Sequence, residues 1–580
     1  MTQRTADAVD LLLGDVPELE ELANLSLAQC ADLAAQIRAF LVRTIVQTGG
    51  HLGANLSSVE LTIALHRAFR SPQTRIIWDT GHQSYTHKIL TGRAGRFGSL
   101  RTREGLSGFP SRSESRHDLL ENSHASVGPG WAYGVAVAVE RPTVVVVGDG
   151  AVIGGVAFEA LNAIGYQRAP VIVVVNDNGR SYAPTPSHLT FGEPIDGAAT
   201  TANPAAFFRS LGFVYHGPVD GHDIRALDAM FAQALNDSLP CVVHVRTQKG
   251  SGWPAALADG AKRMHDVTPH AHAGGGSGGM SWSEIAGRVL CEAAAGDPRV
   301  HALTAAMSGT VGLDEFKHRF PNRHHDLGIA EQACVAMAAG LASQGRRPFF
   351  PVVATFLTRA LDQVLNDVAL HHLPVVFLLD RAGLTGPDGP SHHGMFDVGM
   401  LRAIPGIEIF CPASAEDLQH LVRDLLARDH GPVAIRYPKA SPGPAVASGL
   451  VRAGRDACLV GYGSTTAFTL TAADILAEQS IDCSVWRLRR THPIDSALVR
   501  HAGTVPLAVT VEEVSAYSGI APHLAYELHS RQADRYTRVG SHTLPDEFLP
   551  HGSRAELLAE LEFSAESIVR LVKQLLAFTP

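Results

Sequence analysis

Short runs of consecutive apolar residues mark most of the strands that this sequence predicts. Val144 to Val147 and Val171 to Val175 are two such runs, and both are rich in β-branched residues, as expected of strands that are buried on both faces of a sheet. Between them the sequence predicts a Gly-Asp-Gly turn followed by a helix. Strand, helix and strand in this order predict a βαβ unit of a parallel sheet.

The same alternation of apolar strands and helices continues along the chain. Leu27 to Val46 has helical apolar spacing and is closed by Gly49-Gly50, and another helix begins at about Ser57. Further strands are predicted at Arg75–Asp79, Gly212–Tyr215, Cys241–Arg246, Val300–Thr304, Arg347–Val353 and Pro374–Leu379, and in the later segments ACLVGY, CSVWRL and LAVTVEE. Further helices are predicted near Ala205, at Ser281–Ala295 and from Glu331 onward, and GPVDGHD is predicted to be a turn. The pattern predicts an α/β fold with mostly parallel sheets flanked by helices.

Two segments divide the chain into three successive α/β units. Residues 271–280 (AHAGGGSGGM) have the composition of a flexible linker, and residues 431–446 combine a strand with a segment rich in Pro and Gly. A chain of 580 residues is long enough for about three or four domains. We therefore predict three domains, at residues 1–275, 281–446 and 447–580.

Composition excludes several classes of function. The net charge of −9 provides no basic field for nucleic acid, and no apolar run approaches the length of a membrane span. The seven cysteines lack CxxC spacing, which argues against structural zinc and disulfides, and Cys334 and Cys411 have the apolar surroundings of small core residues. Acidic residues interrupt the N-terminal segment where a signal peptide would be apolar. We expect a cytoplasmic enzyme whose partners are small molecules, with no nucleic acid and no membrane.

Two oxygen donors follow the two valine-rich strands. Asp149 comes directly after the first strand, between Gly148 and Gly150, and Asn178 lies just beyond the end of the second. In an open parallel sheet, ligands bind at the carboxyl ends of the strands. Mg²⁺ prefers such oxygens and usually completes its shell with phosphate. The alternative is an Asp in a turn and an Asn that caps the next segment, but the paired spacing favours a metal site.

Other polar residues lie beside predicted turns and helix starts. Glycine-flanked histidines and a lysine follow predicted elements and are well placed for a ligand, although each one taken alone fits a structural or exposed role: His51, His82, His87 and Lys88. A second group lies at the start of an apolar helix, where backbone N–H groups favour an anion: His124, Ser126 and Gly128.

Two further features occur in the second half of the chain. Glu331 opens a helix of small residues, where a carboxylate would also be favoured simply by the helix dipole. The loop DRAGLTGPDGPSHHGMFD indicates the rim of a substrate or cofactor site, because it gathers four polar side chains: Arg381, Asp388, His392 and His393. An isolated arginine could instead form a surface ion pair.

These motifs together resemble one family of enzymes. The GDG turn, the NDN strand end and the GIAEQ segment resemble thiamine diphosphate enzymes of the transketolase type. Further motifs narrow the resemblance to the 1-deoxy-D-xylulose 5-phosphate synthase family, over nearly the whole chain. The motifs are GGHLGANLSSVELTIALH, GHQSYTHKILTGR, GLSGFPSRSES, GDGAVIGGVAFEALN, NDNGRSYAPT, GPVDGHD, GIAEQ, TFLTRALDQVLNDVALHHLPVVF, DRAGLTGPDGPSHHGMFD and LPDEFLPHG.

The resemblance implies a transketolase-like fold with thiamine diphosphate and Mg²⁺ as cofactors. It implies that Asp149, Asn178 and the backbone carbonyl of Arg180 hold the metal. Glu331 matches the catalytic glutamate that hydrogen-bonds a ring nitrogen of the aminopyrimidine, and Phe356 matches the aromatic residue that stacks on the pyrimidine. The cofactor-binding set implied in this way is His82, His124, Ser126, Gly148, Asp149, Gly150, Ala151, Asn178, Lys249, Glu331 and Phe356.

The resemblance also implies residues that act on the substrates. His51 and His82 match histidines that face the reacting carbons and shuttle protons near neutral pH. The catalytic set implied is Glu331, His51, His82 and His392. The substrate-binding set implied is Arg359, Arg381, Asp388, His392 and Arg489.

Two of these arginines match residues that hold the phosphate of glyceraldehyde 3-phosphate. They are Arg381 and Arg489, and the planar fork of a guanidinium suits phosphate oxygens. The second assignment leaves Arg487 and Arg490 open as alternatives, because all three lie in WRLRRTHPID.

The reaction implied by the resemblance is decarboxylation of pyruvate and transfer of the two-carbon unit to glyceraldehyde 3-phosphate. The products are 1-deoxy-D-xylulose 5-phosphate and CO₂. The resemblance also implies a homodimer with the cofactor between the first and second domains. Whether those domains come from one chain or from two stays open.

The sequence departs from the family pattern at four places. Val353 stands where a Tyr is usual, and Ala333 stands where a His is usual. Residues 123–128 read SHASVG instead of GHSSTS, and the loop after NDNGRSYAPT is shorter than usual. The lost hydroxyl and imidazole would change the polarity of the pocket. The alternatives are therefore a related carboligase with a different acceptor aldehyde and a non-catalytic regulatory relative; transketolase itself fits DRAGLTGPDG and GPVDGHD less well.

Overall fold

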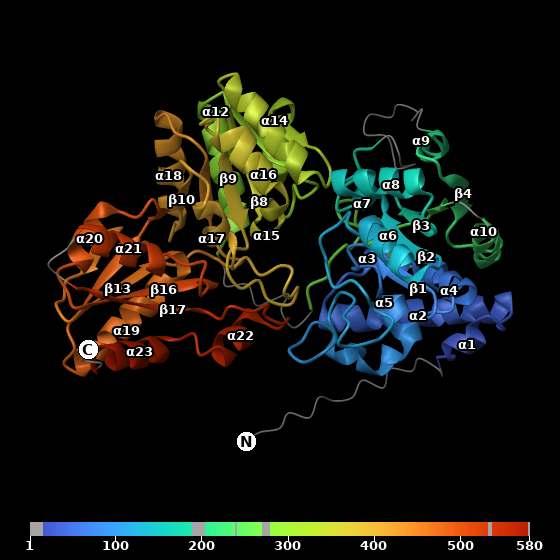
Figure 1. The fold of residues 1–580 in the computed structure, drawn as a ribbon, viewed down its shortest axis with the longest axis horizontal. Helices are drawn as coiled ribbons and strands as arrows, with labels where there is room; N and C mark the ends of the chain where they lie inside the picture. Colours follow the sequence, from blue (N-terminus) through green and yellow to red (C-terminus); the bar gives the residue numbers. More distant parts are fainter. Residues whose placement is uncertain (1–15, 188–202, 238–239, 270–278, 532–535, 578–580) are drawn as a thin grey trace. The chain divides into compact units, whose positions relative to one another are not determined.

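The chain forms two compact units, each with its own core. The computed structural model describes residues 16–187, 203–237, 240–269, 279–531 and 536–577. The first unit holds the described residues up to 269 together with Gly328–Ala330, and the second holds the described residues 279–327 and those from 331 onward. Most of the predicted linker lies outside the described residues. Within the described chain the strands form three sheets, one in the first unit and two in the second (Figure 1).

The first unit is built on a sheet in which every neighbouring pair of strands is parallel, in the order β1-β2-β3-β5-β4. The strands are β1 (Arg75–Trp78), β2 (Thr143–Gly148), β3 (Val171–Asp177), β4 (Val214–Asp220) and β5 (Cys241–Arg246). β2 and β3 are neighbours, with Val144 opposite Ile172. They are connected by α7 (Asp149–Val152) and α8 (Gly155–Gln167). The predicted βαβ unit is therefore confirmed.

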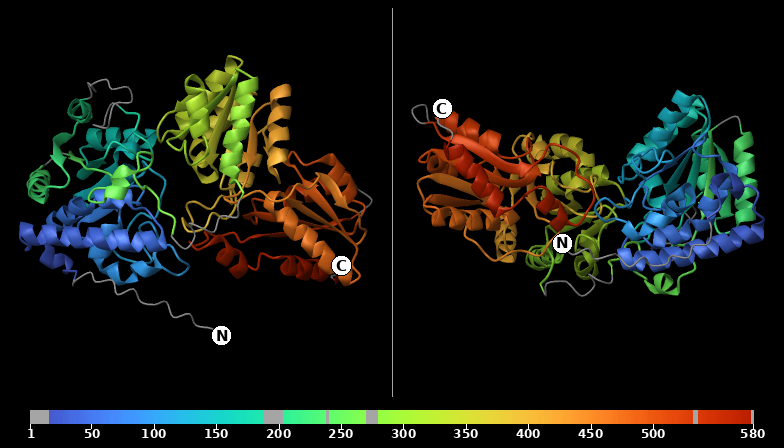
Figure 2. Two further views of the ribbon diagram at one scale, coloured as in Figure 1. Left: turned by 180° about the vertical axis from the view of Figure 1, so that it is seen from behind. Right: turned by 90° about the horizontal axis from the view of Figure 1, so that it is seen from below.

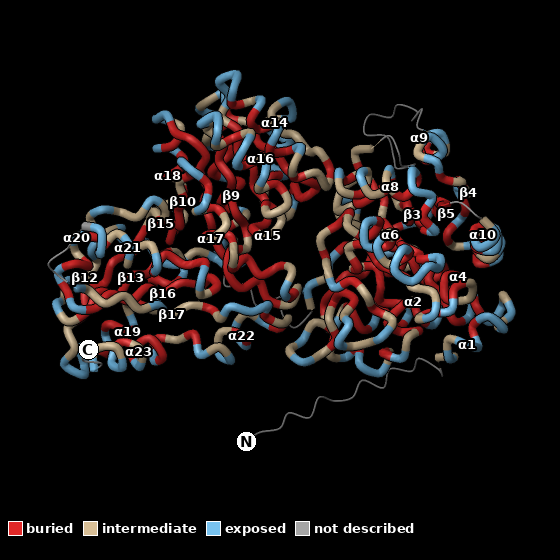
Figure 3. Tube along the Cα trace, in the orientation of Figure 1, coloured by how far each residue is buried: buried red, intermediate tan, exposed pale blue. Residues whose placement is uncertain are grey.

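Helices cover both faces of this sheet, because successive residues of its strands point in opposite directions. Val144 and Val146 pack with one set of helices: α2 (Leu27–Thr48), α4 (Val59–Ala68) and α10 (Ile224–Asn236). Val145 and Val147 pack with another set: α6 (Gly128–Val139), α8 and α9 (Pro204–Ser210). All four valines are fully buried, which explains why this strand is an uninterrupted apolar run. Figure 3 shows the neighbouring strand β3 in the colour of buried residues.

The ends of the long N-terminal helix follow the predicted signals. α2 begins with a capping box between Ser26 and Gln29 and stops at Gly49, whose φ is +75°. The remaining helical segments of this unit are α1 (Leu19–Leu22), α3 (Gly53–Ser57), α5 (Tyr85–Lys88), η1 (Ile89–Arg93), η2 (Ala94–Ser99) and α11 (Pro254–Ala258).

The second unit contains a sheet of order β15-β10-β11-β9-β8-β6-β7. Its strands are β6 (Val300–Thr304), β7 (His324–Asp326), β8 (Arg347–Val353), β9 (Val376–Asp380), β10 (Glu408–Phe410), β11 (Val433–Arg436) and β15 (Arg490–His492). Its helical segments are α12 (Trp282–Gly296), α13 (Asp314–Arg319), η4 (Pro321–Arg323), α14 (Glu331–Ser343), α15 (Ala354–Leu357), η5 (Thr358–Ala360), α16 (Leu361–Gln363), η6 (Val364–Ala369), α17 (Asp397–Arg402) and α18 (Ala415–Ala427). β15 comes from the last third of the chain and pairs antiparallel with β10, so the C-terminal segment contributes an edge strand to this sheet.

The third sheet also lies in the second unit and has the order β12-β14-β13-β16-β17. Its strands are β12 (Gly449–Arg452), β13 (Ala457–Tyr462), β14 (Cys483–Leu488), β16 (Leu507–Ser515) and β17 (Arg538–Leu544). One face packs with α19 (Thr466–Glu478) and α23 (Ala565–Ala577), and the other with α20 (Ser496–Ala502) and α21 (Ala521–Arg531). These helices are labelled in Figure 1, and Figure 2 gives two further views of the ribbon. The remaining helical segments are η7 (Gly463–Thr465) and α22 (Arg554–Glu560).

The strand predictions fail at irregular and short strands. GPVDGHD was predicted as a turn, but β4 continues through it to Asp220. The pairing of β4 with β5 shifts register between His216 and Val219, with Gly217 at a φ of +111°, so a bulged strand has the Gly-Pro composition of a turn. The strands β7, β10, β12 and β15 have only three or four residues each, which is too short for a periodic signal.

Two expectations from composition can be compared with the fold. Among the described residues, no helix combines the length and the apolar character that crossing a membrane requires. All seven cysteines are buried and carry free thiols. The predicted core role of Cys334 and Cys411 is therefore confirmed.

Candidate active site

Asp149 and Asn178 lie at the carboxyl ends of the neighbouring strands β2 and β3. The parallel register places Gly148 opposite Asn176 and so brings the two predicted ligands together. The Oδ1 atom of Asp149 accepts a hydrogen bond from the backbone N–H of Asn178 at 3.4 Å. Its Oδ2 atom accepts one from the hydroxyl of Thr185 at 2.5 Å. The structure therefore brings Asp149 and Asn178 together at this sheet edge, and their role as metal ligands stays a prediction.

The surroundings of Asp149 favour a bound cation. Asp149 is 1% exposed. Burial and the charge of Asp177 raise the pKa of its carboxyl group to about 7, against the opposing hydrogen bonds from Thr185 and Asn178. The Oδ1 atom of Asn178 is buried and has no hydrogen-bond partner within the described part of the chain. A metal ion would stabilise the charged carboxylate and use this amide oxygen as a ligand, so the residues fit a Mg²⁺ site.

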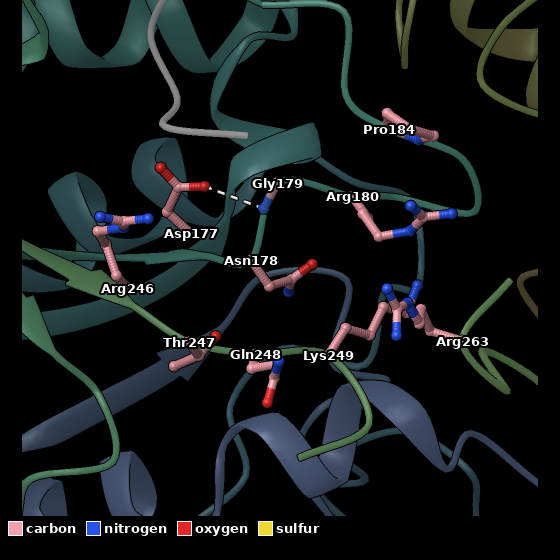
Figure 4. A pocket seen from close by; sticks show the side chains of 10 residues that line it. All are labelled: Asp177, Asn178, Gly179, Arg180, Pro184, Arg246, Thr247, Gln248, Lys249 and Arg263. Carbon is pink, nitrogen blue, oxygen red and sulfur yellow. Dashed lines mark hydrogen bonds between the residues drawn. The ribbon is translucent and has the colours of Figure 1, made fainter. Parts of the chain in front are cut away.

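A pocket of about 280 Å³ opens beside Asn178 (Figure 4). It is lined by Asp177, Asn178, Gly179, Arg180, Pro184, Arg246, Thr247, Gln248, Lys249 and Arg263. Figure 4 shows Arg180, Lys249 and Arg263 together on one side of Asn178 and Arg246 on the other. This positive charge suits an anionic group such as a diphosphate.

The side chain of Arg180 is engaged within the protein. Its Nη2 atom donates to the carbonyl oxygens of Gly260 and Ala261, both at 2.9 Å. Its backbone forms an isolated bridge with Pro184. The predicted role of the Arg180 carbonyl as a metal ligand stays a prediction.

Three histidine rings gather in the first unit, where the sequence predicted two. The ring centroids of His51 and His82 lie 5.5 Å apart. His265 lies 5.7 Å from His51 and stacks on His82 at 5.1 Å. Burial, and then the neighbouring cationic groups, keep the pKa of His82 and of His265 well below the ordinary value. Burial therefore favours the neutral form of both rings.

His265 was not among the predicted site residues, because its segment, KRMHDV, has neither a strand end nor a glycine turn. Its Nδ1 atom lies 2.7 Å from Nζ of Lys249, and the ring of Tyr182 packs on it at 4.0 Å. Lys249 also donates to the carbonyl of Ser181. Burial lowers the pKa of Lys249 to about 7, against the attraction of Asp149. The predicted cofactor ligand Lys249 thus connects the pocket with the histidine cluster.

Asn55 holds the two predicted catalytic histidines in place. Its Nδ2 group donates to the backbone carbonyls of His51 and His82, both at 2.7 Å. Its Oδ1 atom accepts from the backbone N–H of Tyr85 at 2.8 Å. Asn55 is fully buried, and no sequence signal singled it out, because its partners come from separate motifs.

His87 and Lys88 belong to the same glycine-rich motif but have structural roles. His87 contacts Asp118 through Nε2 at 2.9 Å and His66 through Nδ1 at 2.9 Å. Lys88 forms an ion pair with Glu114. Both residues are fully buried, so the structural alternative holds for each.

The expected anion site at the start of α6 is already filled by a side chain. The backbone N–H groups of Ser126 and Gly128 donate to the carboxylate of Asp79 at 2.9 and 2.6 Å. The Ser126 hydroxyl donates to the carbonyl of Ala151 at 2.7 Å. These two amides thus bind an anionic group, as expected, but the group is the carboxylate of Asp79 in the same chain, so these two N–H groups are already engaged. Cofactor roles for His124, Ser126 and Ala151 stay predictions.

In the second unit, four predicted residues form two contacting pairs. Glu331 is the first residue of α14 and is 3% exposed. Burial raises the pKa of its carboxyl group, and the Arg359 guanidinium, with Nε 3.3 Å from Oε2, acts in the opposite direction. The rings of Phe356 and His392 meet edge to face at 5.5 Å. The structure thus brings residues from separate motifs into contact within this unit, and their roles toward cofactor and substrate stay predictions.

Family models match most of the chain. The model described as 1-deoxy-D-xylulose-5-phosphate synthase matches residues 13–191 and 193–247, the transketolase pyrimidine binding domain matches 278–443, and the transketolase C-terminal domain matches 448–568. A 1-deoxy-D-xylulose-5-phosphate synthase 1 of Kitasatospora griseola is 42% identical, over 96% of this chain and 94% of its own length. A 1-deoxy-D-xylulose-5-phosphate synthase 2 of Streptomyces coelicolor is 41% identical, over 98% and 96%. The chain belongs to the 1-deoxy-D-xylulose-5-phosphate synthase family.

Membership of this family confirms the resemblance and the predicted fold class. A solved transketolase of Campylobacter jejuni is 17% identical, over 96% of this chain and 99% of its own, with a TM-score of 0.45. The 1-deoxy-D-xylulose-5-phosphate synthase family uses thiamine diphosphate with a divalent metal such as Mg²⁺. The chain is therefore a thiamine diphosphate-dependent transferase.

In this synthase-family chain, the predicted rim residues share the loop between β9 and α17. Arg381 follows β9 directly, at a φ of +61°. Gly383 and Gly394 exchange two backbone hydrogen bonds, at 2.7 and 2.8 Å, and close the loop. A carboxylate oxygen of Asp388 lies 3.8 Å from Nζ of Lys439. The loop is thus a closed structure, which the sequence alone did not show.

Arg489, the expected second phosphate arginine, is paired with carboxylates. Its Nε lies 2.8 Å from Asp417 and its Nη1 lies 3.5 Å from Asp424, both on α18. Arg487, an open alternative, also pairs with Asp417. A substrate phosphate would have to compete with these carboxylates. The phosphate role of Arg489 stays a prediction, and the ion-pair alternative describes the present arrangement.

The departures from the family pattern lie in different surroundings. Val353 is fully buried at the end of β8, and Ala333 lies on the exposed face of α14. The shortened loop includes residues 188–202, which lie outside the described residues. Val353 therefore belongs to the buried part of the second unit and not to an exposed rim.

One further group of metal-type ligands occurs in the described residues, formed by His216, Asp237 and Cys241. Nε2 of His216 lies 2.7 Å from Oδ2 of Asp237, which is a hydrogen-bond contact. Burial, and then the charge of Asp237, raise the pKa of the Cys241 thiol to about 12. We interpret this group as a hydrogen-bonded structural cluster.

Proposed function

We propose that this protein decarboxylates pyruvate and transfers the remaining two-carbon unit to glyceraldehyde 3-phosphate, which gives 1-deoxy-D-xylulose 5-phosphate and CO₂. Relatives that carry the name of this synthase are 41% and 42% identical over nearly the full length of both chains. Within the chain, the observation that carries the proposal is the buried carboxylate of Asp149 and the buried Oδ1 atom of Asn178 beside a positively charged pocket. This pair and the pocket match the metal and diphosphate parts of the cofactor.

Residues of the first unit would bind the cofactor and its metal. Thiamine diphosphate, when bound, supplies the carbanion chemistry that breaks and forms the carbon–carbon bonds. Asp149 and Asn178 would hold Mg²⁺ through their side-chain oxygens. Lys249 and Arg263 would balance the remaining charge of the diphosphate.

Proton transfer and hydrogen bonding to the substrates would depend on buried side chains. The raised pKa of Glu331 allows its carboxyl group to share a proton with a ring nitrogen of the cofactor. Arg359, at 3.3 Å, limits that rise and orients the carboxylate. Burial favours the neutral form of the His82 and His265 rings, in which each ring would offer one N–H donor and one nitrogen acceptor to a substrate.

The reaction can be tested directly with the purified protein. It is incubated with Mg²⁺, thiamine diphosphate, pyruvate and glyceraldehyde 3-phosphate, and both CO₂ and the ketose phosphate are measured. We expect both products, and we expect Asp149→Ala to weaken Mg²⁺-dependent cofactor binding before any other property. Absence of CO₂ from pyruvate with every acceptor offered would disprove the proposal.

A second candidate is a related carboligase that uses a different acceptor aldehyde. The observation that favours it is Arg489, whose ion pairs with Asp417 and Asp424 compete with a substrate phosphate. This candidate predicts CO₂ release from pyruvate but poor turnover with glyceraldehyde 3-phosphate. Product identification by mass spectrometry over a panel of phosphorylated and unphosphorylated aldehydes distinguishes the two.

The protein is also proposed to be a homodimer. Support comes from large apolar side chains on the surface of each unit: Trp131 and Val137 on α6 are 47% and 59% exposed, and Leu370 after η6 is 75% exposed. Burial of these apolar side chains against a second copy of the chain would remove them from water, which favours association. Light scattering after size exclusion should give twice the chain mass of 61.6 kDa. Trp131→Glu should shift the protein toward the monomer, and a wild-type monomer would contradict the proposal.

The domain limits and the cellular location also stay proposals. The limits at 275/281 and 446/447 are supported by the family models, which end and begin at 247/278 and 443/448. Seven free thiols without a disulfide support a reducing, cytoplasmic location. Limited proteolysis and cell fractionation test the two proposals separately.

A further inference from the structure

The two consecutive histidines of the SHHG segment have different surroundings. The ring of His392 meets Phe356 at 5.5 Å. The ring of His393 is 1% exposed and is bonded at both nitrogens. Its Nδ1 atom accepts from the backbone N–H of Thr385 at 3.0 Å, and its Nε2 atom lies 3.0 Å from the carbonyl oxygen of Pro550.

These two partners determine the tautomer of His393. A backbone N–H can only donate, so Nδ1 carries no proton, and a carbonyl can only accept, so Nε2 carries one. Burial lowers the pKa of this ring, while the Pro550 carbonyl and the carboxylates of Asp388 and Glu513 act in the opposite direction and His551 acts with burial. His393 is therefore a neutral bridge with a donor end and an acceptor end.

The bridge joins a loop of the second sheet to a motif from the third. Thr385 lies in the loop between β9 and α17, residues 381–396, which we call the rim loop. Its hydroxyl also donates to the carbonyl of His392 at 2.5 Å. Pro550 belongs to LPDEFLPHG, a motif with no role in the proposed chemistry. Thr385 thus bonds the backbone of His392 with its hydroxyl and the ring of His393 with its amide.

A second anchor lies one residue away. The backbone N–H of Leu384 donates to Oε1 of Glu513 at 2.8 Å, and Oε2 of the same carboxylate accepts from Arg554 at 2.5 Å. Glu513 is 3% exposed and belongs to β16 of the third sheet. The rim loop is therefore tied to the third sheet and its following segment at two adjacent residues, so its shape depends on both sheets.

We propose that His393 is a positioning residue that orients His392 for the substrate. It does so by linking Thr385 to the Pro550 carbonyl, which gives the LPDEFLPHG motif the role of an anchor for the rim loop. The inference rests on the proposed function, because it takes His392 as part of the substrate site. His393 would affect the reaction rate only through the position of His392. A displacement of about 1 Å in an active-site group can lower activity ~10²-fold.

Two substitutions at His393 and one control separate positioning from general stability. His393→Leu removes both hydrogen bonds, whereas His393→Gln keeps one donor and one acceptor. The control is His430→Leu, which removes another buried imidazole of the second unit, bonded to the carbonyl of Gly431 at 2.6 Å outside the rim loop. All variants are studied as full-length protein with Mg²⁺ and thiamine diphosphate.

The measurements are kcat and KM for both substrates, the cofactor Kd, and hydrogen–deuterium exchange of the peptide covering residues 381–394. We expect His393→Leu to lower kcat/KM by about 10²-fold, with unchanged cofactor Kd and faster exchange in this peptide. His393→Gln should restore most of both properties, and His430→Leu should leave both near wild type.

Three results would overturn the inference. Wild-type kinetics and exchange in His393→Leu would show that the bridge does not matter. Equal damage in His393→Gln with normal exchange would show that the imidazole itself is needed rather than its position. Equal damage in His430→Leu would show a general loss of stability. If the wild-type protein does not turn over pyruvate, the proposed function fails, while the exchange comparison still decides the positioning of the loop.

Discussion

Asp149 and Asn178, which form the proposed diphosphate end of the site, are positioned by neighbouring strands of one sheet. The rim loop is positioned by contacts with a distant part of the chain. Asp149 and Asn178 are 29 residues apart and stand at the ends of neighbouring strands, so the register of one sheet brings them together. The rim loop depends on a partner 157 residues further along the chain, as the contact between His393 and Pro550 shows. The first arrangement is local, and the second exists only when two sheets have packed.

This difference separates two functional properties. Cofactor binding rests on a βαβ unit whose strands, turn and ligands follow each other in the sequence. Placement of the rim rests on residues of another sheet, which can change without any effect on the cofactor ligands. Substrate preference can therefore diverge within this fold while use of the cofactor persists.

The largest expected effect comes from Glu331, which should separate turnover from cofactor binding. Glu331→Gln keeps the size of the side chain but removes the carboxyl group that can share a proton. We expect kcat to fall by about 10²–10⁴-fold, with the Mg²⁺-dependent cofactor Kd much less changed. Steady-state kinetics and calorimetry measure the two quantities. Activity near that of the wild type would contradict the assigned role.

A buried ion pair beneath the rim loop should matter most for stability. Arg436 on β11 contacts Asp397, the first residue of α17, through two hydrogen bonds of 2.9 and 3.1 Å. Both side chains are almost fully buried. Asp397→Ala leaves a buried guanidinium unpaired, which should cost about 3–5 kcal/mol of unfolding free energy.

The control for this pair is an exposed one in the same unit. Arg452 and Asp474 lie 2.8 Å apart, with 29% and 76% exposed side chains, so Asp474→Ala should cost less than about 1 kcal/mol. Both are measured by denaturant unfolding. A similar small loss in Asp397→Ala would show that the rim region does not depend on its buried pair.

The central strands could be predicted from the sequence, and the edges could not. β2 and β3 are buried on both faces, so they appear as runs of valine. β15 and β12 have three and four residues and take their places from pairing with distant strands, which leaves no local pattern. The bulge in β4 had the composition of a turn.

The same limit applies to the site. Asp149, Asn178 and Glu331 lie in motifs at strand ends or a helix start, and sequence reasoning found them. Asn55 and His265 were missed because their roles come from contacts between separate segments. The hydrogen bonds from the first residues of α6 to the carboxylate of Asp79 could likewise not be predicted, because Asp79 lies far away in the sequence.

Acid should weaken the first unit through a carboxylate of α4. Burial alone would raise the pKa of Glu60, but hydrogen bonds from His222 and Arg38 outweigh it and lower the pKa from 4.5 to about 2. A group with a lowered folded pKa adds stability above its unfolded pKa, and this contribution is lost as the pH falls from about 4.5 toward 2. The difference in unfolding free energy between wild type and Glu60→Gln should shrink by about 2 kcal/mol between pH 6 and pH 3. A constant difference would contradict this.

The smallest effect is expected from Thr185. It tests whether the register of the sheet alone positions the carboxylate of Asp149. Its hydroxyl donates to Oδ2 of Asp149 at 2.5 Å, from the segment that follows Asn178. Thr185→Val keeps the shape of the side chain and removes this bond. Groups that orient a metal ligand typically change metal affinity by about 10–100-fold, and we expect about tenfold for Mg²⁺ in calorimetric titrations of cofactor binding.

The matched control is Thr247→Val in the same pocket. The Thr247 hydroxyl donates its hydrogen bond to Oδ1 of Asn176 at 2.6 Å, and not to Asp149 or Asn178. If loss of a pocket hydroxyl alone mattered, both variants would weaken Mg²⁺ equally. If orientation of the Asp149 carboxylate matters, only Thr185→Val does so. An unchanged Mg²⁺ affinity in Thr185→Val would mean that the sheet register alone positions Asp149, because the ligand would then need no support beyond its own strand.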